Sequence, residues 1–89
     1  MTGLENSSDE HIVLFIANLK KGILKVNEMD EKTRNFSNGH DLPPLEAVNQ
    51  NHLFLDTFTA EAFRRGINPD EIIPEANELH EIWLEERKK

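Results

Sequence analysis

Apolar residues in the first third of the chain recur at alternating spacings of four and three positions. The members of this apolar ladder are Ile12, Ile16, Leu19, Ile23 and Val26. Such spacing places all five side chains on one face of an α-helix, whereas a strand would bury every second residue. The ladder therefore predicts an amphipathic helix from about residue 8 to residue 30. Ser7 and Glu10 have the spacing of a capping box at its start.

A loop and a second helix follow this first helix. Between residues 31 and 42 the periodicity disappears and turn-forming residues replace it. We expect Phe36, the large apolar residue of this loop, to fold back against the helices. Pro44 suits the first position of a helix over 44–65, and Gly66 follows this helix as a C-terminal stop signal.

The third predicted helix contains a proline that interrupts it. Asn68 and Pro69 have the character of a capping residue and a first helical residue, which predicts a helix over 69–87. Pro74 lacks a backbone donor, and its ring clashes with the carbonyl four residues earlier. We therefore expect either a separate turn over 69–73 or a kink at Pro74.

The length of 89 residues allows one domain. The predicted fold class is all-α: an antiparallel three-helix bundle over residues 8–87, between disordered ends at 1–7 and 88–89. A chain this small buries only about 60–65 % of its unfolded surface. Dimerisation or binding to a partner would complete the core and add stability.

Two of the predicted helices carry more apolar surface than one core-facing stripe requires. On a helical wheel of about 100° per residue, second stripes flank the main ones. These second stripes consist of Val13, Ala17 and Leu24 in the first helix and of Ala47, Phe54 and Phe58 in the second. Apolar patches with aromatic residues are typical of protein interfaces. We predict that these six residues form an interface with a second copy or a helical partner. The alternative is that the 31–42 loop covers them within one chain.

The acidic composition restricts the partners that this protein can bind. Its formal net charge is −7, and 30 % of its residues are charged. This charge argues against nucleic-acid binding, because phosphates are neutralised by Lys and Arg. The longest apolar run, 12–17, is much shorter than the ~20 residues that span a bilayer. We therefore expect a cytoplasmic protein without a membrane partner.

The sequence contains no motif of an enzyme, a metal site or a cofactor site. It has no cysteine, no nucleophile motif and no glycine-rich phosphate loop. His52 and His80 fall near core-facing stripes of different helices and could approach each other. Zinc needs three or four ligands, and the helical spacings His-x-x-x-His and Glu-x-x-His do not occur. We expect a partly buried, hydrogen-bonded histidine pair, no cofactor, no metal and no enzyme activity.

Three functional hypotheses follow from the sequence. The first is a non-enzymatic interaction or regulatory module that self-associates or docks through the second apolar stripes. The alternative is an acidic inhibitor or immunity-type protein that blocks a basic surface, such as a nucleic-acid-binding one. Its acidic residues are interleaved with lysines, whereas a mimic of DNA would align them in rows. A third hypothesis is a small regulatory subunit that contributes helices to a shared core.

Overall fold

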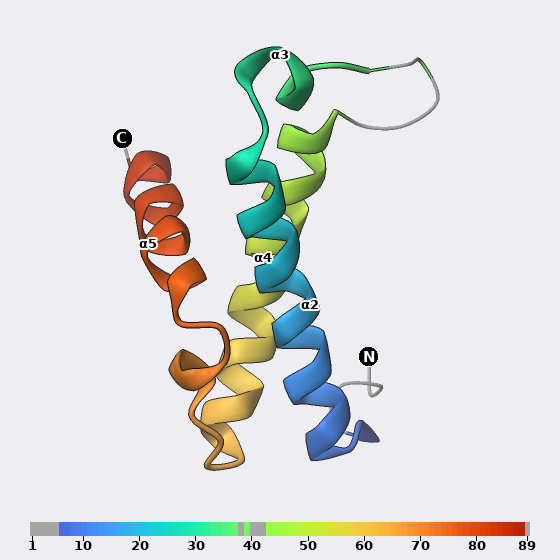
Figure 1. Ribbon diagram of the computed structural model, residues 1–89. Coiled ribbons are helices and arrows are strands. Elements are labelled where there is room, and N and C mark those ends of the chain that lie inside the picture. Colours follow the sequence, from blue (N-terminus) through green and yellow to red (C-terminus); the bar gives the residue numbers. More distant parts are fainter. Residues whose placement is uncertain (1–5, 38, 40–42, 89) are drawn as a thin grey trace.

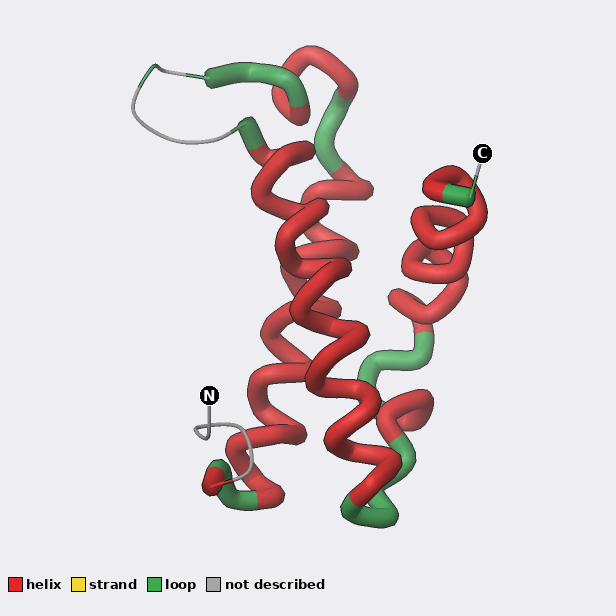
Figure 2. Tube along the Cα trace, turned by 180° about the vertical axis from the view of Figure 1, so that it is seen from behind, coloured by secondary structure: helices red, strands yellow, loops and turns green. Residues whose placement is uncertain are grey.

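In the computed structural model, which describes residues 6–37, 39 and 43–88, the described chain is helical and contains no strand. Its long helices are α2 (Asp9–Glu28), α4 (Pro44–Arg64) and α5 (Glu75–Arg87). α2 and α4 run in opposite directions and lie side by side, with α5 along one side of them (Figure 1). From behind, α5 still stands to one side of the α2–α4 pair (Figure 2). Among the described residues, no helix has the length and apolar character needed to cross a membrane.

The apolar ladder lies at the centre of the contact between α2 and α4. Its side chains meet an aliphatic stripe of α4, which buries both away from water and stabilises the pair. All five ladder residues face inward as predicted: Ile12, Ile16 and Ile23 are buried, and Leu19 and Val26 are partly buried. α4 contributes Val48, Leu55 and Ala62 to the same cluster.

The ends of α2 differ from the prediction by one or two residues. Ser8 caps the helix, because its hydroxyl accepts a hydrogen bond from the backbone N–H of His11 at 3.1 Å. The predicted capping box at Ser7 is therefore wrong. At the other end α2 stops at Glu28, because Asp30 is used as the cap of the next helical turn.

That next turn, α3 (Glu31–Arg34), lies in the segment predicted as a loop. Its formation depends on a polar signal rather than on an apolar pattern: Asp30 Oδ1 accepts from the backbone N–H of Thr33 at 2.7 Å, and α3 buries no residue. Phe36 is 63 % exposed, so the expectation that it folds back against the helices is wrong. Residues 38 and 40–42 of the predicted loop lie outside the described part of the chain, as do residues 1–5 of the predicted tail.

The connection from α4 to α5 forms a separate turn, which is the first of the two predicted alternatives at Pro74. A 3₁₀ turn, η1 (Pro69–Glu71), begins after Asn68, whose Oδ1 accepts from the backbone N–H of Asp70 at 3.0 Å. Ile73 then has a φ of +46°, and α5 begins after Pro74. A positive φ is rare for a β-branched residue and costs about 1–3 kcal/mol. The backbone is therefore strained at Ile73, two residues before α5 begins.

Candidate functional site

The α2 residues of the predicted interface share a stripe with a buried lysine. Val13, Ala17, Lys20 and Leu24 follow one another at spacings of four, three and four. Lys20 is only 2 % exposed, and its Nζ donates to the carbonyl oxygens of Pro69 at 2.8 Å and Ile72 at 2.5 Å. Burial lowers the pKa of its ammonium, and nearby Asp70 partly opposes this. The part of this stripe around Lys20 therefore faces η1, where Ala17 and Leu24 are half-buried, whereas Val13 is 36 % exposed.

The α4 residues of the predicted interface face a different side of α2. Ala47, Asn51, Phe54 and Phe58 form one stripe on α4. The Phe58 ring stacks on Phe15 of α2, with ring centroids 5.2 Å apart. A Cβ added at Gly22 would lie 2.5 Å from Nδ2 of Asn51, so these two positions are in contact. Gly22 and Lys20 are two positions apart and project from nearly opposite sides of α2. The six predicted residues are thus divided between two sides of the α2–α4 pair.

We call the side formed by Phe15, Phe54 and Phe58 the aromatic face. Phe54 is 55 % exposed, Phe15 is also exposed, and Phe58 is half-buried beneath its stacked partner. Of these three residues, Phe54 and Phe58 belong to the predicted interface, and Phe15 does not. The exposed rings lie away from α5, on the side of α2 that contacts Asn51 through Gly22.

Between α4 and α5, the two predicted histidines form a contact. Nδ1 of His52 lies 2.8 Å from Nδ1 of His80, and Nε2 of His80 lies 2.7 Å from Oδ1 of Asp56. The His52 ring also stacks on Trp83, with centroids 4.6 Å apart, while Trp83 Nε1 donates to Asn49 Oδ1 at 2.8 Å. Hydrogen bonds and stacked rings therefore attach α5 to α4.

The histidine pair accommodates a single proton between its two Nδ1 atoms. Burial, followed by the positive charge that His80 can carry, lowers the pKa of His52 to about 4, although Asp56 opposes this. His52 is consequently neutral near pH 7. Among the described residues, which exclude His40, no three His, Cys, Asp or Glu side chains are grouped to hold a metal ion.

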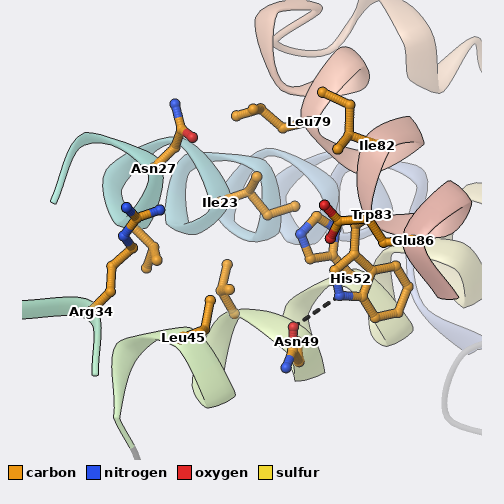
Figure 3. Close-up of a pocket in the computed structure, with 12 residues that line it drawn as sticks. Ile23, Asn27, Arg34, Leu45, Asn49, His52, Leu79, Ile82, Trp83 and Glu86 are labelled. Carbon is orange, nitrogen blue, oxygen red and sulfur yellow. Dashed lines mark hydrogen bonds between the residues drawn. The ribbon is translucent and has the colours of Figure 1, made fainter. Parts of the chain in front are cut away.

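An open groove of about 220 Å³ lies beside this cluster, between α2, α4 and α5 (Figure 3). Trp83 and His52 form part of its wall, and Arg34 and Glu86 approach it from different elements. The groove is smaller than the about 300–1,000 Å³ of pockets that hold drug-sized ligands. Its lining consists of Ile23, Val26, Asn27, Arg34, Leu45, Val48, Asn49, His52, Leu79, Ile82, Trp83 and Glu86.

The carboxylates of α5 are concentrated on its outer surface. Neither lysine nor arginine occurs between Glu75 and Glu86, so the expectation of interleaved lysines does not hold there. Within the described chain, only Glu85 of this group forms an ion pair, with Lys88 at 3.8 Å. The exposed members of this acidic surface are Glu75, Glu78, Glu81, Glu85 and Glu86.

A second charged cluster fastens the end of α4 to the start of α2. The buried carboxylate of Glu61 accepts hydrogen bonds from Arg64 and from Arg65, and Arg65 also pairs with Asp9 at 2.8 Å. The bonds from Arg64 and Arg65 lower the pKa of Glu61 to about 2. These groups satisfy one another, which indicates a structural role.

Comparisons with known proteins supply no relative from which a role could be transferred. The chain matches no protein-family model, no curated protein and no solved structure. The arrangement of its own residues is therefore the basis for a functional proposal.

Proposed function

We propose that this protein is a non-enzymatic interaction module that self-associates through the aromatic face. The observation that carries this proposal is the exposed ring of Phe54 next to the stacked pair of Phe15 and Phe58. Aromatic side chains are enriched at the centres of protein interfaces, where they supply most of the binding energy. In this proposal α2, α4 and α5 form a three-helix bundle whose core is completed by a second copy.

The charges near the aromatic face favour a second copy despite the net charge of the chain. From Ala47 to Phe58 the only carboxylate on α4 is Asp56, which is bound to His80 on the α5 side. The central part of α2, residues 11–27, contains lysines but no carboxylate. Two copies that meet here would therefore keep their acidic α5 helices apart.

The geometry also suits an isologous dimer. α2 and α4 present one surface made of two antiparallel helices, and a two-fold axis through Phe54 would pair it with its copy. The result is a layer of four helices, a common way to bury apolar helix faces. The half-buried Ala17 and Leu24 would then pack within each chain, and Val13 would remain exposed on the other side. Ala47, Phe54 and Phe58 would lie between chains.

Sedimentation of two neighbouring variants tests this proposal. Phe54 is 55 % exposed and Leu53 is 49 % exposed, but they project from α4 in directions about 100° apart. We expect the unaltered protein and Leu53→Ser to sediment as dimers, and Phe54→Ser to sediment as a folded monomer. A monomeric unaltered protein at high micromolar concentration would contradict the proposal, as would equal effects of both substitutions.

A second candidate is an acidic inhibitor that blocks a basic surface. It is favoured by the carboxylates of α5 that have no ion-pair partner among the described residues, Glu75, Glu78, Glu81 and Glu86. Binding of this kind weakens steeply as salt rises, because exposed charges are screened. Self-association through the aromatic face changes little with salt, so sedimentation over a range of salt concentrations separates the two candidates.

A further inference from the structure

We infer that the groove between α2, α4 and α5 is a docking site for a basic amphipathic helix of a protein partner. This site lies on the α5 side of the molecule and is separate from the aromatic face. It therefore does not rest on self-association, and a monomeric variant would retain it.

The groove has an apolar interior with apolar residues left exposed at its rim. Ile82 of α5 is 48 % exposed and Leu45 of α4 is 41 % exposed, and both line the space. Trp83 and Leu79 contribute further apolar surface from α5. A volume of about 220 Å³ suits a few aliphatic side chains better than a cofactor.

The walls of the groove favour a helical occupant. Leu79 and Ile82 are three residues apart on α5, and Ile23 and Val26 have the same spacing on α2. Such spacing forms ridges with grooves between them, and the side chains of another helix at positions i, i+3 or i+4, and i+7 fit into these grooves.

Charge complementarity gives the occupant its basic character. Glu86 lines the groove together with one base, Arg34, and Glu78 lies outside the lining, one turn before Ile82 on the same helix. Both glutamates are exposed, and neither forms an ion pair within the described chain. Lysines or arginines that flank the apolar side chains of a partner helix would pair with them.

A second copy of this chain does not fit the groove in the same way. α5 is acidic, and α4 contains three carboxylates, Glu46, Asp56 and Glu61, against the single base Arg64. The lysines of α2 belong to a helix whose apolar ladder is already buried against α4. The occupant is therefore a helix from another protein.

Fluorescence anisotropy with a synthetic helix tests this inference. The probe is a labelled peptide of about 14 residues of leucine, lysine and alanine, with leucines at helical spacing. That length spans about 20 Å, close to the length of α5. Two further peptides are controls: one has glutamate in place of lysine, and the other has the same composition in scrambled order.

Matched variants identify the site on the protein. We expect Ile82→Asn to weaken binding of the basic peptide about tenfold. Leu53→Asn, at a similarly exposed position outside the groove, should change this binding less than about twofold.

Charge variants test the acidic side chains near the groove. The double variant Glu78→Gln and Glu86→Gln should weaken binding of the basic peptide about threefold to tenfold and reduce the salt dependence of this binding. The pair Glu10→Gln and Glu71→Gln should leave it nearly unchanged. Arg34→Gln should strengthen binding of the basic peptide, because it removes from the lining a positive charge that repels the lysines of the peptide.

Amide and indole NMR shifts of the unaltered protein provide a readout that does not depend on the folding of any variant. Titration with the basic peptide should shift Ile82 and the Trp83 indole N–H and leave Leu53 in place. Equal binding of the glutamate or scrambled peptide would overturn the inference. So would shifts confined to the aromatic face, or the absence of binding at about millimolar peptide. Phe54→Ser should bind the peptide normally, which separates this result from the outcome of the self-association test.

Discussion

The contact between α2 and α4 and the attachment of α5 are built in different ways. α2 meets α4 through aliphatic side chains such as Ile16 and Leu55, which are buried almost completely. α5 adds the buried Ala76 and the half-buried Leu79 to the apolar contacts, and polar and aromatic groups also attach it. These are the His52–His80 contact, the Trp83–Asn49 hydrogen bond and the bonds from Lys20 to the η1 segment. The first contact buries the aliphatic side chains at its centre, and the second borders an open groove.

This difference implies unequal stability of the two regions. Burial of aliphatic surface is non-directional and roughly proportional to area, so the α2–α4 pair tolerates small shifts. Each hydrogen bond contributes only about 0.5–1.5 kcal/mol net, but the loss of one partner leaves the other buried and unpaired. α5 should therefore open locally before the α2–α4 pair unfolds.

The largest effect should come from a cavity in the α2–α4 contact. Ile16 has no exposed surface, and Ile16→Ala removes side-chain volume that its neighbours cannot refill. We expect a loss of about 2–5 kcal/mol in the free energy of unfolding, measured by urea denaturation followed by circular dichroism. Leu53→Ala, at a half-exposed position, should cost less than about 0.5 kcal/mol. A loss below about 1 kcal/mol for Ile16→Ala would show that this contact is not the main source of stability.

Replacement of the buried lysine should loosen α5 selectively. Lys20→Met leaves the carbonyl of Ile72 without its donor, whereas the carbonyl of Pro69 keeps the hydrogen bond from the backbone N–H of Ile72. The expected cost is about 1–3 kcal/mol. Hydrogen exchange should show faster exchange in α5 than in α2 or α4. The exposed neighbour provides the control, since Lys21→Met should leave all three helices protected as before. Uniform loss of protection would contradict the separate opening of α5.

Acidification should weaken the same attachment through His52. Its pKa falls from 6.5 to about 4 on folding, so the unfolded chain binds more protons between these values. Stability is therefore fully present above pH 6.5 and decreases as the pH falls towards about 4. The full shift of the His52 pKa corresponds to about 3 kcal/mol in the free energy of unfolding. We expect a loss of about half this value, because local opening of α5 admits water to the imidazole.

Denaturant titrations between pH 6.5 and 4 measure this loss of stability, and His52→Gln should remove it. Glu61, whose pKa is lowered to about 2, produces a separate loss of stability below pH 4.5. Persistence of the decrease between pH 6.5 and 4 in His52→Gln would assign it to another group.

The smallest effect is expected at Gly22. Gly22→Ala gains about 1 kcal/mol of helix propensity, but its Cβ must displace the amide of Asn51, which lies 2.5 Å from that position. These terms oppose each other, so we expect a net change within about 0.5 kcal/mol in thermal or urea unfolding. With Asn51→Ala in the background, Gly22→Ala should stabilise by about 1 kcal/mol. Destabilisation in that background would mean that α2 and α4 themselves must move apart.

The sequence predicted the α2–α4 contact and the local signals before α5, but it did not predict which polar groups are buried between the helices. Periodicity detects aliphatic burial, so the ladder residues from Ile12 to Val26 were assigned to the core correctly. The break at Pro74 and the capping role of Asn68 were also predicted, because proline and capping residues act locally. The contact of His52 with His80 followed from the placement of both near core-facing stripes.

Burial of polar groups was not predictable from local pattern. No pattern in the sequence indicates that Lys20 is buried, because its partners are backbone carbonyls 49 and 52 positions further along the chain. Consequently the stripe of Val13, Ala17 and Leu24 was assigned to the same surface as Phe54. The cap of α3 by Asp30 could have been found from the spacing of Asp30 and Thr33.

The position of Trp83 makes the attachment of α5 directly observable. Trp83 is the single tryptophan of the chain, which also lacks tyrosine, so its emission is not mixed with that of another indole or phenol. Its ring stacks on His52, borders the groove and lies 4.5 Å from the Arg87 guanidinium. Detachment of α5, protonation of His52 and occupation of the groove would each change the surroundings of this one fluorophore. The unmodified protein thus contains its own optical reporter for the less stable of its two helix contacts.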